Sequence, residues 1–266
     1  MITVRSVWED VEKIRKASPL INNITNLVVM NNTANALLAL GASPVMVDSE
    51  EEIEQMVGIS SALVVNIGTL GTSCVNAMKK GMKKAREKGI PIVLDPVGVG
   101  ATPYRSQIIQ ELFSAAVPTI IRGNASEISA VISPDVKTKG VDSTMESAAA
   151  STAGRALSSR HNCVVSISGE EDYIIQGNEV EIIRNGHSMM PRVTGLGCTA
   201  TAISAAFAAV NSSAFAAAAH AMAVMGIAGE IAARKAAGPG SLQMHFLDAL
   251  FNLTETDIGL LKTGKA

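Results

Sequence analysis

The stretch Val193-Thr194-Gly195-Leu196-Gly197-Cys198-Thr199-Ala200-Thr201-Ala202 brings a glycine-rich turn directly into a long alanine-rich segment. Glycines at positions 195 and 197 allow the backbone to turn sharply and to approach a ligand closely. The residues that follow supply unpaired N–H groups at the positive end of a helix dipole, a place that attracts anions and phosphates above all. The stretch therefore predicts a loop that becomes the N-terminus of an anion-binding helix.

Cys198 falls in the first turn of that helix. The field of the helix is expected to lower the pKa of its thiol from the usual value of about 8.5 and to favour the thiolate. The functional interpretation is a nucleotide-phosphate site with a reactive group in it. The alternative is a common glycine-flanked helix start followed by a buried, inert cysteine.

The composition favours one large α/β domain covering residues 1–266, because no Pro/Gly/Ser-rich linker or charge block divides the chain. Charged residues make up only 17% and aromatic residues 3%, so the core must be built from Ala, Val, Ile, Leu and Met, and we expect an oligomer to hide part of the surface. The net charge of −2 gives no electrostatic footprint for nucleic acid or an anionic membrane.

The three cysteines, Cys74, Cys163 and Cys198, are isolated and form neither a disulfide framework nor a zinc-ligand spacing, which suits a reducing cytoplasm. No basic region followed by an apolar run opens the chain, so we expect no signal peptide. Residues 202–229 alone could pass for a membrane span. Their alanine content and the break at Asn211-Ser212-Ser213 favour two buried helices instead.

Continuous apolar strands alternate with amphipathic helices along the chain, a pattern that indicates a mostly parallel sheet covered on both faces. A hairpin with Gly-Asn turn chemistry, at residues 173–175 and 180–183, predicts a small antiparallel extension. The predicted strands are 20–26, 44–47, 62–67, 92–94, 118–121 and 163–168. The predicted helices are 5–17, 27–40, 50–59, 145–159, 197–210, 213–235 and 242–252, together with a lysine-rich helix that ends at residue 89. Residues 134–142 are predicted to form a surface loop.

Sheets of this kind bind ligands at the carboxyl ends of their strands, where several polar residues are expected. Asp95 is suited to hold Mg²⁺ or to orient a substrate hydroxyl, or else it only shapes the turn before Pro96. Arg122 is suited to clamp a phosphate, and Glu127 to organise Mg²⁺; alternatively Glu127 completes a helix cap and complements the dipole. Ser168 reaches the same edge, whereas the acidic run after it is expected to be a solvated turn.

Asn22, Asn23 and Asn26 lie at a strand-to-helix junction, where they either cap the helix or bind a ligand. His187 and His245 have no obvious partner and are expected to be structural.

In order along the chain, these motifs resemble those of the hydroxyethylthiazole kinases of thiamine biosynthesis, members of the ribokinase-like superfamily. The resemblance covers nearly the whole chain, and its motifs are Ser18-Pro-Leu-Ile-Asn-Asn-Ile-Thr-Asn26, Gly41-Ala-Ser-Pro-Val-Met46, Asn66-Ile-Gly-Thr-Leu70, Asp95-Pro-Val-Gly98, Arg122-Gly-Asn124 and Gly238-Pro-Gly-Ser241. It implies a ribokinase-like α/β fold without a lid domain. It also implies a homotrimer with active sites between subunits.

The resemblance further implies ATP- and Mg²⁺-dependent phosphorylation of the hydroxyl of 4-methyl-5-(2-hydroxyethyl)thiazole. The residues it assigns are Asn26, Met46 and Gly195 for the thiazole, Arg122, Ser168, Thr194 and Gly197 for ATP, Asp95 and Glu127 for the metal, and Cys198 as the catalytic residue. Most relatives in the superfamily carry an aspartate general base where this chain has Cys198. Two positions depart from the family pattern: Ser168 replaces a frequent threonine, and Leu196 fills a slot usually held by a smaller residue.

The mechanistic hypothesis is that the N–H groups of residues 195–198 bind the transferring γ-phosphate while Arg122 and Mg²⁺ neutralise the phosphate oxygens. Cys198, as a thiolate, would assist removal of the proton from the substrate hydroxyl. The alternatives are a hydroxymethylpyrimidine or pyridoxal kinase, a nicotinamide-nucleotide-hydrate dehydratase, or a non-catalytic nucleotide-binding regulator that uses the same anion hole.

Overall fold

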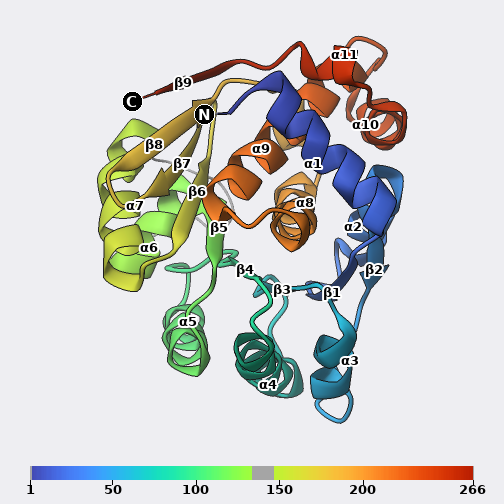
Figure 1. Ribbon diagram of the computed structural model, residues 1–266. Coiled ribbons are helices and arrows are strands. Elements are labelled where there is room, and N and C mark those ends of the chain that lie inside the picture. Colours follow the sequence, from blue (N-terminus) through green and yellow to red (C-terminus); the bar gives the residue numbers. More distant parts are fainter. Residues whose placement is uncertain (1, 134–146, 266) are drawn as a thin grey trace.

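The computed structural model describes residues 2–133 and 147–265 (Figure 1). Within these ranges nine strands form one sheet in the order β2-β1-β3-β4-β5-β6-β7-β8-β9. The strands are β1 (Leu20–Ile24), β2 (Ser43–Val45), β3 (Ala62–Asn66), β4 (Ile92–Asp95), β5 (Ile120–Asn124), β6 (Val164–Ser168), β7 (Asp172–Gln176), β8 (Glu179–Ile183) and β9 (Thr263–Lys265).

The strands from β2 to β6 pair in parallel, and β7, β8 and β9 add an antiparallel extension at one side. The parallel strands therefore deliver their carboxyl ends to one edge of the sheet. The predicted mostly parallel α/β fold with a small antiparallel part is confirmed, and the described residues form no lid over that edge.

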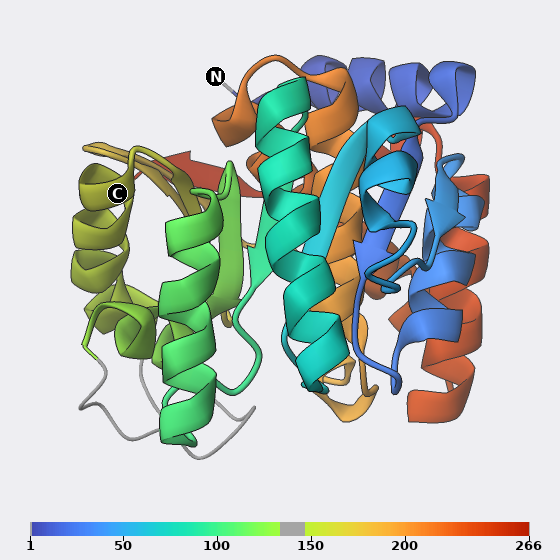
Figure 2. The same ribbon diagram turned by 90° about the horizontal axis from the view of Figure 1, so that it is seen from below.

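Helices cover both faces of the sheet, as Figure 2 shows from below. The helices on one face are α1 (Val4–Ala17), α2 (Met30–Leu40), α8 (Leu196–Val210), α9 (Ala214–Ala233) and α10 (Pro239–Asn252), and those on the other are α3 (Ile53–Ile59), α4 (Thr72–Lys88), α5 (Pro103–Ala115), α6 (Ala125–Ile132) and α7 (Ser147–His161). Two short elements, η1 (Met190–Arg192) and α11 (Glu255–Ile258), complete the description. Each face packs on its own apolar cluster, as expected for a sheet buried on both sides.

Local signals set most helix ends. The Thr3 hydroxyl accepts the N–H of Ser6, and the Ser6 hydroxyl accepts the N–H of Thr3, so α1 begins with a capping box. It ends at Ser18, as predicted. Gly41 ends α2 in the left-handed conformation, with φ of 108°, which confirms its predicted role as a cap.

Several N-terminal elements are shorter than their patterns predict. Strand β1 ends at Ile24 rather than residue 26. Helix α2 begins at Met30 rather than residue 27, because Leu27 and Val28 lie in an exposed turn with 72% and 64% of their surface accessible. The apolar periodicity thus extends past the part that packs. Strand β2 ends at Val45, and α3 begins at Ile53 rather than residue 50. The predicted loop at 134–142 and the first two residues of the helix predicted at 145–159 lie outside the described residues.

The long apolar segment near the C-terminus forms two helices, α8 and α9, with the break at residues 211–213 where it was predicted. By length and composition α9 passes the test for a membrane span, yet 78% of its most apolar window is buried inside the fold. Its small side chains let it pack against α8, α10 and the sheet. The packing therefore supports the interpretation of α9 as a core helix of this domain.

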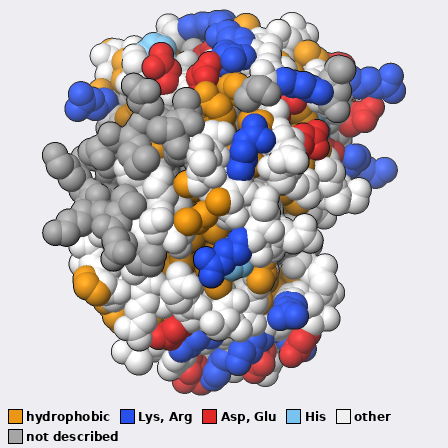
Figure 3. Space-filling view, turned by 90° about the vertical axis from the view of Figure 1, so that its left-hand side faces the viewer, with side chains coloured by type: hydrophobic (Ala, Val, Ile, Leu, Met, Phe, Trp, Pro, Cys, Tyr) orange, Lys and Arg blue, Asp and Glu red, His pale blue; other side chains and the backbone are white. Residues whose placement is uncertain are grey.

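The predicted hairpin forms β7 and β8, with Gly177 at a φ of 58° in the turn. Strand β9 was not predicted, because Thr263–Lys265 is a short polar segment at the sheet edge with no alternating apolar pattern. On the face in Figure 3, lysine and arginine side chains are interspersed with acidic ones around an apolar middle, rather than gathered into one basic surface.

Candidate active site

A row of polar side chains crosses the carboxyl edge of the sheet beneath the start of α8. Asn66 at the end of β3 pairs in register with Asp95 at the end of β4, and Arg122 on β5 pairs with Ser166 on β6. Their sequence neighbours Val65, Leu94 and Ile121 belong to the apolar cluster of the opposite face. Because side chains alternate along a strand, the polar residues point toward α8.

Asp95 is anchored from two elements at once. One carboxylate oxygen accepts hydrogen bonds from the Thr201 hydroxyl on α8 (2.7 Å) and from the Asn66 amide (2.9 Å). The side chain is only 1% exposed, and burial raises its pKa above the ordinary value, although Arg122 and these hydrogen bonds oppose the shift. Asp95 therefore does more than shape the turn before Pro96, because its carboxylate links the sheet to α8 by hydrogen bonds.

A second chain of hydrogen bonds leads from Asp95 to Cys198. The Oδ1 atom of Asn66 accepts the Asn26 amide and the Gly68 N–H, each over 2.9 Å. The same Asn26 Nδ2 donates to Cys198 Sγ over 3.3 Å. A side chain at position 68 would put its Cβ 2.7 Å from Asn26 Nδ2, so this contact requires glycine. Asn26 acts here through its amide side chain, whereas Val29 occupies the N-cap position of α2.

The prediction that Cys198 is a thiolate is wrong. Burial raises the pKa of its thiol to about 11, and the nearby Asp95 carboxylate raises it further, against smaller opposing effects of Asn66, Asn26 and Arg122. The dipole argument placed the residue correctly in the first turn of α8 but left out the desolvation of the thiol and its carboxylate neighbour. At neutral pH the group is therefore a neutral thiol.

The glycine turn has the predicted geometry. Gly195 has a φ of 85°, and a Cβ there would come within 2.6 Å of Val29 Cγ1. The first main-chain bond of α8 runs from the Thr199 N–H to the Gly195 carbonyl at 2.8 Å. The N–H groups of residues 196–198 thus have no partner within the helix, an arrangement of the kind that binds anions at helix N-termini. Thr194, just before it, is exposed.

Arg122 faces this turn with an unmatched donor. Its side chain is 8% exposed, its Nε is buried without a hydrogen-bond partner, and no carboxylate of the described residues makes an ion pair with its guanidinium. A Cβ on Gly197 would lie 2.9 Å from Arg122 Nη1. The neighbouring Ser166 Oγ is also buried and unpartnered. A buried cation with free donors beside a helix N-terminus is chemically suited to a phosphate.

Glu127 forms the capping box that was predicted as one alternative. Its two carboxylate oxygens accept the N–H groups of Gly98 and Asn124, each over 2.9 Å, and its own N–H donates to Asn124 Oδ1. Burial, followed by the charge of Asp95, raises the pKa of Glu127 to about 7 despite those hydrogen bonds. The residue is thus both a helix cap and a buried acid beside a second one.

Asp95 and Glu127 give a donor set of two carboxylates, and within the described ranges no group of three His, Cys, Asp or Glu side chains forms a cation cage. Two carboxylates suit Mg²⁺, which usually keeps several waters and takes its remaining ligands from substrate phosphates. Burial raises the pKa values of both acids, and the charge of Asp95 raises that of Glu127 further, so a cation bound between them would offset both effects. The residues therefore fit Mg²⁺, with Glu127 better placed to act through water because backbone amides already occupy its oxygens.

Ser168 lies opposite Asn124 in the β5–β6 register, half-buried, with its hydroxyl 3.5 Å from the Gly123 carbonyl oxygen. The acidic run that follows is not wholly a solvated turn. Asp172 is half-buried and accepts the Gly169 N–H, and burial raises its pKa to about 6, with Arg122 opposing the shift.

Met46 lies on the side of the site away from Arg122, since β2 pairs with β1, the strand that leads to Asn26. It follows β2, the outermost parallel strand, four strand positions from β5. At about 4.8 Å per strand this places it roughly 19 Å from Arg122 across the sheet. The two predicted histidines play local roles: His187 accepts the Met189 N–H, and His245 lies 3.6 Å from Asp248.

Sequence reasoning did not identify Asn66, Thr201 or Arg105 as site residues. Asn66 has a detectable signal, since it ends a strand as Asp95 does, and Thr201 lies one turn beyond Cys198 on the same helix face. Arg105 on α5 donates to the carbonyls of Ile67, Gly68 and Val97, so it joins the loops after β3 and β4. No spacing in the sequence indicates that role.

Comparisons with known proteins agree with this geometry. A model of the "HK: Hydroxyethylthiazole kinase family" matches residues 11–256. Proteins named hydroxyethylthiazole kinase from Syntrophus aciditrophicus and Leptospira biflexa are 60% and 53% identical to this chain over 97% and 96% of it, and 96% of each relative is covered.

Among solved structures, the hydroxyethylthiazole kinase protein of Pyrococcus horikoshii superposes with a TM-score of 0.91 at 38% identity, covering 98% of this chain and 99% of that one. A pyridoxal kinase from Staphylococcus aureus aligns with a TM-score of 0.62 over 79% of this chain and 87% of its own, but at 18% identity it shares the ribokinase-like fold alone. The family match across the chain and the identity to its relatives settle the assignment: this chain belongs to the hydroxyethylthiazole kinase family.

Proposed function

We propose that this chain transfers the γ-phosphoryl group of ATP to the hydroxyl of 4-methyl-5-(2-hydroxyethyl)thiazole, as the names of its relatives suggest. The observation that carries the proposal is the pairing of Arg122, whose buried Nε has no partner, with the free N–H groups at the start of α8. Together they make a desolvated anion site at the ligand-binding edge of the sheet.

In this proposal Arg122, Ser168, Thr194 and Gly197 contact ATP. The corner formed by Asn26, Gly195 and Cys198 receives the hydroxyethyl arm of the thiazole. Mg²⁺, held by Asp95 and by Glu127 through water, would supply neutralisation of the phosphate charge. The α8 amides and Arg122 orient the transferring group and bind its oxygens.

Cys198 lies next to the acceptor hydroxyl as a neutral thiol, fixed by Asn26. Phosphoryl transfer through a loose transition state asks mainly for alignment and charge neutralisation. We therefore assign Cys198 a positioning contact with the hydroxyl in place of the thiolate base expected from the sequence.

We further propose that residues 1–266 act as one kinase domain in the cytoplasm and that it assembles as a homotrimer. In such a trimer Met46, which follows the outermost parallel strand, would contact a thiazole bound largely by a neighbouring subunit. Exposed Leu27 and Val28, beside Asn26, supply apolar surface for such a contact.

The direct test is ADP release by the purified protein with Mg-ATP, in the presence and absence of hydroxyethylthiazole. We expect release that depends on the thiazole, with the phosphorylated alcohol as the second product. Turnover with pyridoxal or hydroxymethylpyrimidine but not the thiazole would assign a sister activity. Tight ATP binding without turnover of any of these substrates would show that the protein is a nucleotide-binding regulator and not an enzyme.

A further inference from the structure

A cavity of about 340 Å³ opens at the edge of the sheet opposite the candidate active site. It lies between α1, the start of α9 and the turn of the β7–β8 hairpin, and its walls include Ser6, Asp10 and His220. Helix α8 ends at Val210, so at a rise of about 1.5 Å per residue it runs roughly 18 Å from Cys198 to this end. The cavity is thus separate from the phosphate-binding corner, and its volume is within the range of small-molecule sites.

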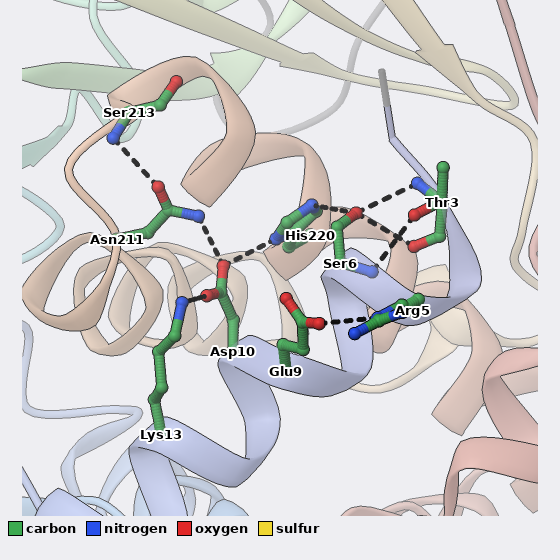
Figure 4. Close-up of polar contacts among 9 residues, drawn as sticks. All are labelled: Thr3, Arg5, Ser6, Glu9, Asp10, Lys13, Asn211, Ser213 and His220. Carbon is green, nitrogen blue, oxygen red and sulfur yellow. Dashed lines mark hydrogen bonds and ion pairs between the residues drawn. The ribbon is translucent and has the colours of Figure 1, made fainter.

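Three of its side chains form a continuous hydrogen-bonded series (Figure 4). The Ser6 Oγ lies 3.1 Å from His220 Nε2, and the His220 Nδ1 lies 2.7 Å from Asp10 Oδ2. Ser6 and Asp10 come from α1, and His220 comes from α9, more than 200 positions away in the sequence. This is the order of contacts in a nucleophile, general base and orienting carboxylate.

The carboxylate of Asp10 is itself held in place. Lys13 Nζ lies 2.7 Å from Oδ1, and the amide of Asn211 donates to Oδ2. Burial alone would raise the pKa of Asp10, but the hydrogen bonds from His220, Lys13 and Asn211 together lower it. Asp10 therefore stays ionised and presents a fixed acceptor to the imidazole N–H.

Packing alone does not require these groups. Residues 214–233 form an apolar, largely buried helix in which His220, 2% exposed, is a costly residue unless paired. A buried charge held by hydrogen bonds can often be replaced, together with its partners, by apolar side chains without loss of stability. The α1 cap needs only Thr3 and Ser6, so the imidazole on the Ser6 hydroxyl is an addition to it.

The hydroxyl of Ser6 carries one proton and has two acceptors, the Thr3 carbonyl at 3.0 Å and the His220 Nε2. Donation to His220 leaves the Nδ1–H of the imidazole to Asp10, which is the protonation pattern a general base needs. The N–H groups of Val4 and Arg5 have no partner within α1, and no acidic residue in the first turn neutralises that helix end.

We propose that Ser6, His220 and Asp10 form a second, hydrolytic site that cleaves small polar carboxylic esters. Ser6 Oγ bonds to the ester carbonyl carbon while its proton passes to His220 Nε2. The bond from that carbon to the alkoxy oxygen then breaks, and the leaving alcohol takes the proton. Water, deprotonated by His220, releases the carboxylic acid and restores the serine. Ser6 and His220 are the catalytic residues, and Asp10 is a positioning residue.

The test uses the full-length protein and a fluorophosphonate probe, which phosphonylates activated serine hydroxyls. We expect mass spectrometry to locate the adduct at Ser6 and the same adduct to abolish hydrolysis of p-nitrophenyl acetate. His220→Gln should slow labelling about 100-fold or more, the scale of general-base assistance. His245→Gln, which alters the surface pair with Asp248, is the matched control and should label at the wild-type rate.

Asp10→Asn should shift the pH midpoint of labelling downward, because the imidazolium loses its carboxylate partner. A merely structural role would change the melting temperature and leave that midpoint unmoved. Folded wild-type protein without an adduct at Ser6 overturns the proposal, and so does labelling at an equal rate in folded His220→Gln. If His220→Gln fails to fold, the wild-type adduct and the Asp10→Asn profile still decide the question.

Discussion

Asn66 and Asp95 occupy directly paired positions on neighbouring parallel strands, and the Asn66 amide donates to the Asp95 carboxylate over 2.9 Å. The other end of the same amide accepts Asn26, which contacts Cys198. One asparagine thus links the buried acid to the thiol, and its side chain is 1% exposed. The alignment of the proposed acceptor corner depends on it.

Replacing Asn66 with Ala should lower kcat for hydroxyethylthiazole about 10- to 100-fold, because misplacement of reacting groups by an ångström has effects of this size. The KM for ATP should change little. The free energy of unfolding should fall by about 1–3 kcal/mol, since Asp95 and Asn26 lose buried partners. Steady-state kinetics and urea unfolding measure both, with Asn76→Ala, a change at a half-buried surface asparagine bonded to Glu50, as the control. An unchanged kcat contradicts the positioning role.

Cys198 should react slowly with iodoacetamide at neutral pH and faster only toward the pKa of about 11 that burial and Asp95 give it. Mass spectrometry separates it from Cys74 and Cys163, whose burial raises their pKa values to about 11 and about 12. With a neutral thiol, Cys198→Ala should keep kcat within about tenfold of wild type, below the usual range for a general base. Rapid alkylation of Cys198 at neutral pH, or a fall in kcat of about 1000-fold in Cys198→Ala, would show that Cys198 acts as a thiolate base after all. A faster Cys198→Asp variant would show that the corner still suits a carboxylate.

Gly197→Ala should raise the KM for ATP by about tenfold, roughly 1.4 kcal/mol of binding, because its Cβ would press on Arg122 Nη1 from 2.9 Å. The fold should survive, since alanine is a good residue in a first helical turn. Gly58→Ala in α3 is the matched control, because a Cβ there meets nothing within 4 Å. If both variants bind ATP with equal affinity, Arg122 does not contact the phosphate.

Glu127 should make the protein less stable as the pH rises. Its pKa is about 7 in the folded state and ordinarily 4.5, so between these values the folded chain binds the proton more strongly than the unfolded chain. The stabilising contribution of that proton is complete below the unfolded-state pKa and is lost as the pH rises through about 7, on the order of 1–3 kcal/mol in all.

Urea unfolding between about pH 5 and pH 8 measures this slope, and Glu127→Gln should flatten it. Mg²⁺ should stabilise the wild type at the upper end of the range and stabilise Glu127→Gln less, because a ligand that binds only the folded state shifts the equilibrium by mass action. If Glu127→Gln leaves the pH dependence of stability unchanged, that dependence arises from another group, such as Asp172. An equal effect of Mg²⁺ on both proteins would remove Glu127 from the metal site.

The sequence was informative where one local pattern decides the outcome. Apolar runs ending at Asp95 and Ser168 predicted buried strands and their shared edge, and the two glycines before Cys198 predicted the turn and the free amides. It was uninformative where three-dimensional neighbours decide. The pKa of Cys198 depends on how deeply α8 buries the thiol and on Asp95 from another strand, and no spacing reports either. Arg105 was missed for the same reason, whereas strand β9 was missed because it is short and polar.

The Arg105 guanidinium holds carbonyl groups from two loops that line the same corner, those after β3 and β4. Fixing the backbone of a loop residue costs about 1–2 kcal/mol of conformational entropy. Because Arg105 orders these loops when the protein folds, substrate binding does not have to offset this loss of conformational entropy. Arg105 thereby preorganises the loops of the corner through contacts to the protein backbone alone.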